Sequence, residues 1–521
     1  MERETESQSE VLAFLTDPAT YSYHGAHGKS VQRIDTHAAS VFLAGNRALK
    51  VKRAVQFPFL DYSTLAKRKE ACEAELAVNA PYAPEIYRGV VAITREPDGR
   101  LAIAGKGTPV EWAVELQRFD ETRTLDHLTS EIDEKLADAL GKAVAAAHEK
   151  APIAKAVPWI TALGVYLDQN LEAFQKMPEL FEPEAVTALD RHSRQAYERM
   201  RPLLAERGRL DRVRRGHGDL HLGNIALIGG RPVLFDAIEF DPLIAAGDVL
   251  YDLAFLLMDL CERGRRGAAN IVFNRYLVET RHIEDLDGLA ALPLFLSLRA
   301  AIRAKVTAAR IENAAAQERE AIAQSARTYF TFARSAITPP KQKFVAVGGL
   351  SGTGKTRLAQ ALAPYVPPVP GAVMVRSDVE RKVLFGIAEI EKLPRQAYAP
   401  EVSARVYTVL DDKARRILAA GHSAIVDAVF ADSQERGALG MVAKATNIPL
   451  EGLFLSANLE CRLARVGARL FDASDADETV VRTQEQYGLG KMDWSLIDAS
   501  GTVEQTLTRA RTALHLTAGG I

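Results

Sequence analysis

Residues Phe344–Ala363 read FVAVGGLSGTGKTRLAQALA, and this stretch determines the architecture expected for the C-terminal part of the chain. An apolar, β-prone run comes first, the glycine-rich segment GLSGTGKT follows at Gly349–Thr356, and helix formers come last. Strand, glycine-rich loop and helix in this order predict a P-loop, whose backbone N–H groups surround the phosphates of a nucleotide at the helix N-terminus. We therefore expect an α/β domain with a parallel sheet flanked by helices over residues 343–521.

Positions in the glycine-rich segment have separate expected roles. Backbone N–H groups from Gly352 to Lys355 would wrap the phosphates, Lys355 would reach the β- and γ-phosphates as a catalytic cation, and Thr356 would ligate Mg²⁺. The predicted nucleotide-binding residues here are Gly349, Ser351, Gly352, Thr353, Gly354, Lys355 and Thr356. No NKxD-type guanine signature is apparent in the sequence, so ATP is favoured over GTP.

A second phosphate-handling motif precedes the first. HGDLHLGNI occupies His217–Ile225, and the hydrophobic run RPVLF leads directly into Asp236. Asp219 and Asn224 share one short loop, so the motif supplies a candidate base and, with Asp236, two oxygen donors for Mg²⁺. This set of hard ligands predicts a second site of phosphoryl transfer from ATP.

On these motifs, residues 20–335 resemble the aminoglycoside phosphotransferase and choline kinase family, which shares the two-lobed protein-kinase-like fold. The resemblance implies that Asp219 is the catalytic base and that Asn224 and Asp236 are metal ligands. It also implies that His217 supports the loop. Two acids in GDVLYDLAFLL, Asp248 and Asp252, are expected to be caps and loop anchors rather than catalysts.

The elements before this motif fit the small lobe of such a kinase. Short β-like runs predict a small sheet over Val31–Arg53, and strong helix formers with a Ser/Thr start predict a helix over Tyr62–Asn79. The segment THAAS, Thr36–Ser40, stands where a glycine-rich phosphate loop would lie but contains no glycine.

The resemblance implies a lysine that grips the α- and β-phosphates and pairs with a helix glutamate. Lys50 is our choice, with Lys52 as the alternative because side chains repeat every second residue on a strand face. Glu75 is the first choice of partner and Glu73 the second. The run AVELQRFD resembles the passage into the hinge that reads adenine, so Leu116–Arg118 are hinge candidates, Leu116 first.

The sequence after the P-loop resembles small P-loop kinases of the polynucleotide-kinase, gluconate-kinase and zeta-toxin groups. The resemblance implies that Asp378 in VRSDVERK deprotonates the acceptor hydroxyl and that Arg381 lies near the acceptor. Asp427, which ends the run AIVD, suits a metal-water or substrate contact. A helix-like stretch resembling a mobile lid carries the arginines expected to neutralise the transferred phosphoryl group, with Arg465 as a catalytic residue. These arginines are Arg462, Arg465 and Arg469.

The best boundary is the double proline of SAITPPKQK, Ser335–Lys343, which interrupts helix-like sequence just before the P-loop strand. At 521 residues the chain exceeds what one hydrophobic core organises. The predicted parts are an N-lobe at 1–118, a helical C-lobe at 119–335, a linker at 336–342 and a P-loop domain at 343–521.

Composition and charge narrow the class of protein. With 65 Lys and Arg against 67 Asp and Glu, the net charge of −2 provides no global basic field for nucleic acid or anionic lipid. The N-terminus is polar and acidic, so we expect no export and a cytoplasmic protein without membrane association. The longest apolar stretch, Leu289–Leu298, is too short for a bilayer crossing of roughly 20 residues, and is expected to form a buried helix. The three cysteines show no metal or disulfide spacing.

These features favour a bifunctional phosphotransferase whose two domains use ATP and Mg²⁺ to phosphorylate small-molecule hydroxyl acceptors. One alternative is a single catalytic domain regulated by a nucleotide-sensing partner domain, which the glycine-free THAAS segment motivates. Another is a nucleic-acid-end kinase in the C-terminal domain, suggested by Val375–Lys382 and disfavoured by the balanced charge. The acceptors and the oligomeric state stay open.

Overall fold

The computed structural model describes residues 8–24, 30–57, 60–468 and 473–516. The chain forms two compact units, one from Met1–Ala162 with Gly208–Leu256 and the other from Leu163–Arg207 with Leu257–Ile521. Three long helices pass from one unit into the other: α4 Ala156–Gln175, α5 Pro183–Arg209 and α7 Val249–Glu262.

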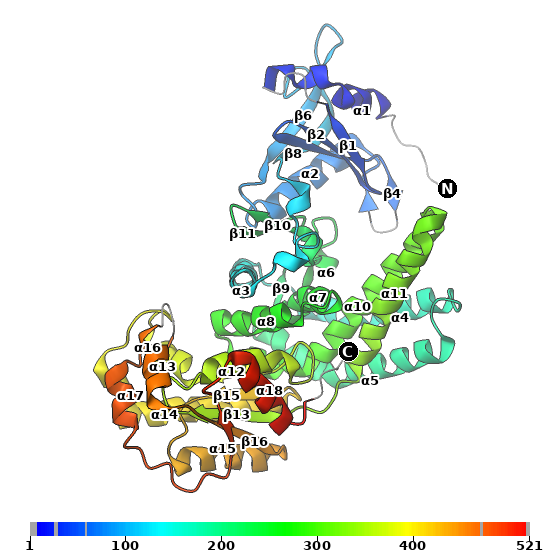
Figure 1. The fold of residues 1–521 in the computed structure, drawn as a ribbon. Coiled ribbons are helices and arrows are strands. Elements are labelled where there is room, and N and C mark those ends of the chain that lie inside the picture. Colours follow the sequence, from blue (N-terminus) through cyan, green and yellow to red (C-terminus); the bar gives the residue numbers. More distant parts are fainter. Residues whose placement is uncertain (1–7, 25–29, 58–59, 469–472, 517–521) are drawn as a thin grey trace. The chain divides into compact units, whose positions relative to one another are not determined.

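A six-stranded antiparallel sheet forms the first part of unit 1, in the order β1-β2-β3-β8-β6-β7 (Figure 1). Its strands are β1 Gln32–Asp35, β2 Ala39–Ala44, β3 Arg47–Lys52, β6 Tyr87–Arg95, β7 Leu101–Ile103 and β8 Thr108–Gln117. One face packs on α1 Ser9–Thr16 around Phe42, Leu49 and Val51, which are fully buried. The β-lobe expected over Val31–Arg53 is confirmed.

Helix α2 Leu65–Asn79 packs against β8 on the other face of this sheet. The helix begins where expected because the Thr64 side chain accepts a hydrogen bond from the Lys67 N–H. This confirms the helix expected over Tyr62–Asn79 apart from its first residues, which lead into the N-cap.

The rest of unit 1 builds the loop that carries HGDLHLGNI. Strands β9 Val213–Arg215 and β12 Ala246–Asp248 pair at its start, and the short helix η4 Leu222–Asn224 ends it. Strands β10 Ile225–Ile228 and β11 Arg231–Leu234 then form a hairpin through Gly229 and Gly230, both at positive φ, as a tight two-residue turn requires. Unit 1 also contains β4 Gln56–Phe57, β5 Leu60–Asp61, α3 Glu134–Lys150 and α6 Pro242–Ala245.

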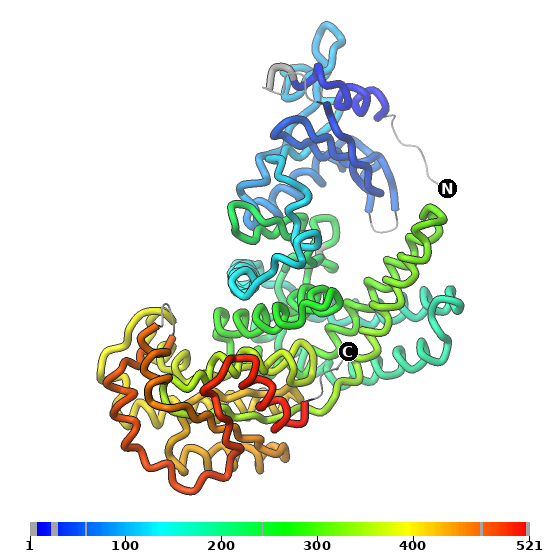
Figure 2. The backbone as a smooth tube through the Cα atoms, viewed as in Figure 1, coloured from blue at the N-terminus to red at the C-terminus, as the bar shows by residue number. Residues whose placement is uncertain are grey.

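Five parallel strands form the sheet of unit 2, in the order β14-β15-β13-β16-β17. They are β13 Phe344–Gly349, β14 Val373–Arg376, β15 Ala424–Asp427, β16 Leu450–Ser456 and β17 Ser495–Asp498. Every residue of β13 and β15 is buried, because helices cover the sheet (Figure 2). The helices of this region are α12 Lys355–Leu362, α13 Ser377–Phe385, α14 Pro400–Ala419, α15 Ser433–Thr446, α16 Leu459–Gly467, α17 Glu478–Gln484 and α18 Val503–Ala513. The expected P-loop fold is confirmed.

Unit 2 also contains helices that precede the double proline. They are α8 Arg266–Thr280, α9 Ile283–Gly288, α10 Leu292–Ala309 and α11 Ala316–Ile337. Figure 1 shows α8 beside the P-loop sheet, and α8 contacts the edge strand β14. These helices therefore group with the P-loop sheet rather than with the β-lobe, and the domain boundary expected at 336–342 stays a prediction.

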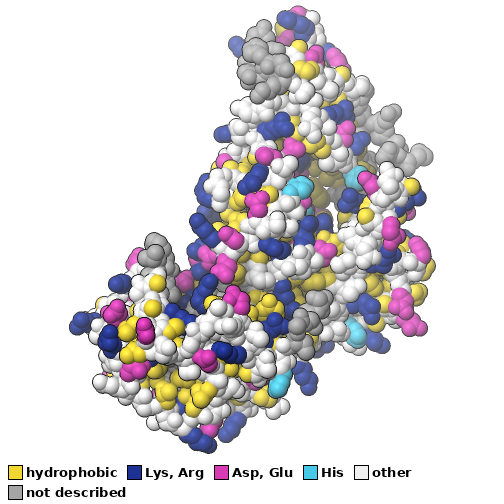
Figure 3. Space-filling view, in the orientation of Figure 1, with side chains coloured by type: hydrophobic (Ala, Val, Ile, Leu, Met, Phe, Trp, Pro, Cys, Tyr) yellow, Lys and Arg dark blue, Asp and Glu magenta, His cyan; other side chains and the backbone are white. Residues whose placement is uncertain are grey.

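Helix α10 and the short turn before it bury the apolar stretch Leu289–Leu298, as expected. Across the described ranges, no helix combines the length and the apolar character needed to cross a membrane. The face drawn in Figure 3 carries basic and acidic side chains interspersed with one another, in keeping with a net charge of −2.

Candidate functional site

The loop of the first site orients Asp219 through its neighbour Asn224. The Asn224 side-chain amide donates hydrogen bonds to the Asp219 carbonyl oxygen and to its Oδ2, both at 3.0 Å. His221 Nε2 lies 3.3 Å from the same Oδ2, and the Asp219 side chain is 39% exposed. The carboxylate is thus held in one orientation yet open to a reactant, which is what a general base requires.

Hydrogen bonds from buried side chains fix the backbone of this loop. The Nε2–H of His217 donates to the Phe235 carbonyl at 2.9 Å, and burial lowers the pKa of this histidine. Asp252 accepts the backbone N–H groups of His217 at 2.8 Å and Gly218 at 3.0 Å. Asp248 accepts the Leu250 N–H at 2.9 Å. The acids expected to be loop anchors and caps therefore have those contacts.

Asp236 has a backbone conformation that non-glycine residues rarely adopt, with φ 59°. Neighbouring contacts impose it: the Phe235 N–H donates to the Asn224 carbonyl at 3.0 Å, and Ala237 exchanges two hydrogen bonds with the buried Asn79 side chain. Strained residues held in this way cluster at functional sites. The contact through Phe235 also brings Asp236 next to the Asn224 loop.

Glu75 is fully buried and lies between both candidate lysines. Its Oε1 is 2.9 Å from Lys50 Nζ and its Oε2 is 2.6 Å from Lys52 Nζ. Burial would raise the pKa of Glu75, but the two lysines lower it to about 2, so the carboxylate is charged. The other candidate partner, Glu73, lies 55% exposed and faces Lys69 instead.

The two lysines have different second partners. Lys50 Nζ is 2.7 Å from Asp236 Oδ1, whereas Lys52, which is buried, pairs with Glu239. Burial opposes the charge on Lys50, but Asp236 and Glu75 outweigh it and raise its pKa well above the usual value. Lys50 is therefore the lysine that joins the helix glutamate to the candidate metal ligand.

Oxygen donors at this site suit Mg²⁺, which prefers carboxylate and amide oxygens and keeps several waters. Asn224 and Asp236 would hold the ion, because the Asn224 amide nitrogen turns to Asp219 and leaves its oxygen on the opposite side. In the part of the chain that is described, no three His, Cys, Asp or Glu side chains gather as a metal cluster.

Backbone hydrogen bonds hold both the hinge candidate Leu116 and the THAAS segment in place. Leu116 lies in β8, opposite Ala48 and Tyr87 in the adjacent strands, and the next N–H, of Gln117, donates to the Ile86 carbonyl. Within THAAS the Thr36 N–H donates to the Ala39 carbonyl at 2.8 Å, which closes a tight turn without glycine. The role of Leu116 in reading adenine stays a prediction.

In unit 2, the P-loop depends on its glycines for close packing. Gly352 and Gly354 have φ of 84° and 93°, and a Cβ on Gly352 would lie 2.6 Å from the Arg462 carbonyl oxygen. A Cβ on Gly349 would lie 2.7 Å from the Leu455 carbonyl oxygen. Helix α12 begins at Lys355, so its N-terminus opens onto this loop.

Thr356, the expected metal ligand, contacts Asp427, for which a metal-water or substrate contact was expected. The Thr356 hydroxyl donates to Asp427 Oδ2 at 2.6 Å, and Arg376 Nε lies 3.8 Å from the same oxygen. The pair forms because β13 and β15 are parallel neighbours, with Val347 opposite Asp427. A threonine hydroxyl beside a carboxylate fits Mg²⁺ bound to nucleotide phosphates.

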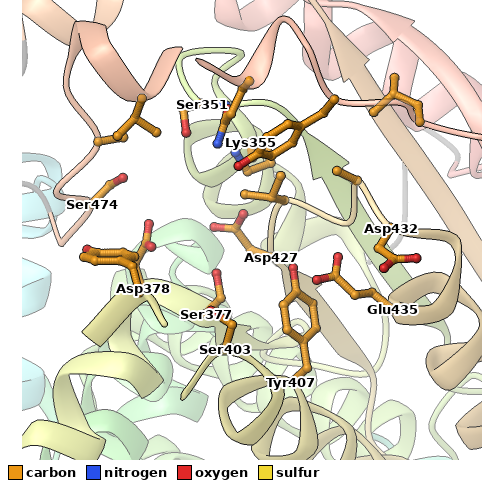
Figure 4. Close-up of a pocket in the computed structure, with 18 of the residues that line it drawn as sticks. Ser351, Lys355, Ser377, Asp378, Ser403, Tyr407, Asp427, Asp432, Glu435 and Ser474 are labelled. Carbon is orange, nitrogen blue, oxygen red and sulfur yellow. The ribbon is translucent and has the colours of Figure 1, made fainter. Parts of the chain in front are cut away.

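Asp378 follows β14 and points into the same cavity as Lys355 and Asp427 (Figure 4). Its enclosure raises the pKa of its carboxyl, and the negative charge of Asp427 adds to this, while Lys355 and Arg376 act in the opposite direction. A carboxylate with a raised pKa is a better proton acceptor at neutral pH. The cavity has a volume of about 820 Å³, enough for a small molecule beside the P-loop.

Arg381 lines this cavity but is already anchored. Its Nη1 donates to the Ala397 carbonyl at 2.6 Å and to Ser403 Oγ at 3.2 Å, and its guanidinium lies over the Tyr398 ring. A direct contact between Arg381 and an acceptor stays a prediction.

The arginines expected on a mobile lid have a different setting. Arg462 is 3% exposed on α16, where its Nε donates to the Ser351 carbonyl at 2.8 Å and its Nη1 contacts Glu485. Arg465 donates to the carbonyls of Thr353 and Ala499. Arg462 thus supports the P-loop from α16, and the phosphate contacts expected of Arg462 and Arg465 stay predictions. Arg469 lies outside the described residues.

Two further residues of this site were not singled out from the sequence. Gln484 of α17 accepts the Ser351 N–H at 2.6 Å, and Arg376 stands beside Asp427. Arg376 lies directly before the Ser-Asp pair of VRSDVERK, so its position at the end of a predicted strand could have indicated that it belongs to the site. Gln484 is remote in sequence, and no local pattern indicated that it reaches the loop.

Comparison with known families supports two kinase regions. Residues 40–292 match a phosphotransferase enzyme family, and residues 344–487 match an AAA domain family. The chain thus combines an aminoglycoside-phosphotransferase-like region with a P-loop region, and it is an enzyme of the kinase type. Kinase families of this type generally use ATP and Mg²⁺.

Relatives of similar length exist in mycobacteria. Uncharacterized proteins of Mycobacterium tuberculosis and Mycobacterium bovis are each 27% identical to the chain over 489 residues, which cover 91% of this chain and 94% of theirs. The aligned length shows that the similarity extends through both regions.

Some solved kinase structures are similar to a part of the chain. A gluconokinase from Sinorhizobium meliloti is 18% identical and covers 33% of this chain and 91% of its own, with a TM-score of 0.25. A choline/ethanolamine kinase family protein from Mesorhizobium loti is 14% identical and covers 63% of this chain and 98% of its own, with a TM-score of 0.37.

Proposed function

We propose that the chain is a bifunctional ATP-dependent phosphotransferase, in which each region transfers the γ-phosphoryl group of ATP to a hydroxyl of a small molecule. One observation carries this proposal: each region brings together a candidate aspartate base, a lysine and a set of oxygen donors. In the first region these are Asp219, Lys50 and Asp236. In the second they are Asp378, Lys355 and the Thr356–Asp427 pair.

At the first site, Asp219 accepts the proton of the acceptor hydroxyl while the acceptor oxygen bonds to the γ-phosphorus. The bond from that phosphorus to the bridging oxygen breaks at the same time, and ADP leaves. Asn224 keeps the Asp219 carboxylate oriented, and Lys50, held by Glu75, binds the phosphates. Asn224 and Asp236 would hold Mg²⁺, which would supply positive charge to balance that of the phosphates.

At the second site, Asp378 has the same task and its raised pKa suits it to accept the proton. The N–H groups of the P-loop and the N-terminus of α12 bind the phosphates, and Lys355 neutralises the group in transfer. Thr356 would hold the Mg²⁺ that accompanies the nucleotide.

The lining of the second cavity favours a neutral or cationic acceptor. Its carboxylates are Asp378, Asp427, Asp432, Glu435 and Asp475, and its cationic side chains are Lys355 and Arg381. Lys355 is assigned to ATP and Arg381 is anchored to the protein, so an anionic acceptor would meet repulsion. The same argument disfavours the end of a nucleic acid. A cytoplasmic location stays a prediction.

The test is product mapping with the purified full-length chain. Wild type, Asp219→Ala and Lys355→Ala are incubated with γ-labelled ATP and a fractionated metabolite extract. We expect at least two labelled products, one lost in each variant. If both variants form all the products of the wild type, the proposal is wrong, and if one product set depends on both residues, one region is regulatory instead.

A further inference from the structure

Helix α8 completes the edge of the P-loop sheet with side-chain amides. Strand β14 is an edge strand, and the Asn274 side chain accepts the Met374 N–H at 2.7 Å and donates to the Ala372 carbonyl at 3.1 Å. Asn270 donates to the same carbonyl at 3.1 Å. The amide of Asn274 therefore serves β14 as a neighbouring strand would. Strand β14 ends at Arg376, two residues before Asp378.

The next residue of α8, Arg275, begins a chain of charged contacts. Its Nη1 lies 2.6 Å from Glu389 Oε2, and Glu389 Oε1 lies 3.3 Å from Arg376 Nη1. Arg376 Nε is in turn 3.8 Å from Asp427 Oδ2, the oxygen that accepts the Thr356 hydroxyl. Three consecutive contacts thus connect α8 with the Thr356–Asp427 pair.

These groups face the P-loop. A cavity of about 520 Å³ is lined by Arg275, Glu389 and Arg376 together with the outer side of the P-loop, from Gly352 to Gly354, and Thr356. The Arg275 side chain is 18% exposed, so solvent screens its pair with Glu389 only partly. The network is therefore close enough to the expected phosphates to influence them.

We infer that Arg275 is a positioning residue of the P-loop site. It shares the Glu389 carboxylate with Arg376, and this leaves the Arg376 guanidinium available to Asp427. Without Arg275, Glu389 would draw Arg376 to itself, and Asp427 would lose the cation that balances it beside Thr356. The binding of a magnesium-bound nucleotide would weaken as a result.

The inference assigns part of the P-loop site to a helix outside the stretch that matches the P-loop family. Arg275 lies within residues 40–292, which match the phosphotransferase family, whereas the AAA domain match covers 344–487. It rests on the proposed function only in taking the P-loop as a nucleotide site.

The test measures binding of ADP and of a non-hydrolysable ATP analogue to the full-length chain by calorimetry, with and without Mg²⁺. The binding component that Lys355→Ala removes is assigned to the P-loop. We expect Arg275→Ala to weaken this component about tenfold in the presence of Mg²⁺, as loss of an outer partner of a metal ligand does, and to change it far less without Mg²⁺. Arg275→Lys should recover most of the affinity.

Arg416→Ala is the matched control. It removes an ion pair with Asp287, at 2.8 Å, that joins α14 to α9 in the same unit without touching the network. Equal weakening by Arg275→Ala and Arg416→Ala, or an unchanged P-loop component in Arg275→Ala, would overturn the inference. If Arg275→Ala does not fold, Arg275→Gln replaces it and should weaken the same Mg²⁺-dependent component; an unchanged component would overturn the inference equally. If Lys355→Ala removes no component, the proposed nucleotide site itself is wrong.

Discussion

Glu75 is the residue on which the electrostatics of the first site converge. It is fully buried, and one carboxylate oxygen faces Lys50 while the other faces Lys52. Both lysines point the same way because β3 alternates its side chains. The choice between Lys50 and Lys52 could not be settled from the sequence because the carboxylate accommodates both.

Replacing this carboxylate should destabilise unit 1. We expect Glu75→Gln to lower the free energy of unfolding by about 3 kcal/mol, the lower end for one partner of a buried ion pair, since Asp236 and Glu239 still balance the lysines. Urea denaturation followed by tryptophan fluorescence in a Trp494→Phe background measures it, because the remaining tryptophans, Trp112 and Trp159, lie in unit 1. The control, Glu73→Gln, should change it by less than about 0.5 kcal/mol, and equal effects would contradict the assignment.

The raised pKa of Asp378 predicts how the stability of the protein depends on pH. Because its pKa in the folded protein is raised, the ionised carboxylate disfavours folding, and stability is lost as the pH rises from the ordinary carboxyl pKa through the raised one. Asp378→Asn should abolish the Lys355-dependent transfer and yet be at least as stable as wild type at neutral pH.

The stability difference should grow over that pH interval and then stay constant. Thermal unfolding midpoints of both proteins across a pH series measure it. A variant that is less stable than wild type at neutral pH and equally stable in acid would reverse the expected sign. The Lys355-dependent activity of wild type should itself fall as the pH drops through the raised pKa.

The P-loop is the element that the sequence specified most completely. Its strand, glycines and helix are local in the chain, so order and spacing were sufficient to predict it. The setting of the arginines of α16 could not be read from the sequence, because whether a helix packs on the loop or moves above it depends on tertiary contacts such as those of Arg462 with Ser351. Gln484, which reaches the loop from a distant helix, had no local signal.

Glycine at position 352 should be indispensable for nucleotide binding. An alanine there combines a positive φ with a Cβ only 2.6 Å from the Arg462 carbonyl oxygen, so the loop must shift. We expect Gly352→Ala to abolish the P-loop binding component measured by calorimetry. Gly421→Ala separates backbone strain from steric clash, since Gly421 has φ 77° but open space around it. It should cost about 1–3 kcal/mol of stability and leave binding unchanged, and loss of binding in both variants would refute the steric explanation.

In the β-lobe, sequence patterns predicted some elements and missed others. The meander of β1, β2 and β3 and the helix α2 were predicted from alternation and helix formers. Strands β6 and β7 were not predicted, because most of their residues are only half-buried and give no clear alternation. The position of Leu116 in β8 followed from the family resemblance rather than from the pattern.

At the level of the whole chain, the two motifs correctly indicated two kinase regions, but the grouping of the helices between them was not predictable. Helix α8 joins the P-loop unit through Asn270, Asn274 and Arg275, which are ordinary polar residues of a helix when read from sequence. The two asparagines find hydrogen-bond partners only at the edge of β14, a strand about 100 residues later in the chain.

Removal of the metal should affect nucleotide binding at both sites without affecting the fold. The donors assigned to Mg²⁺ are oxygens of Asn224, Asp236 and Thr356, and such sites take up the ion with the nucleotide rather than during folding. We expect a chelator to abolish both transfer activities and the nucleotide-dependent rise in the unfolding midpoint. The midpoint of the nucleotide-free protein should not change, and a fall on chelation alone would indicate a structural metal instead.

Two independent nucleotide sites in one chain are tested most directly by counting bound nucleotide. Equilibrium dialysis with a magnesium-bound, non-hydrolysable ATP analogue should give two moles per mole of wild-type chain at saturation. Lys355→Ala and Asp236→Asn should each give one, and the double variant none; asparagine suits position 236 because it tolerates the left-handed backbone. A single mole per chain in wild type, or two in either variant, would contradict the proposal.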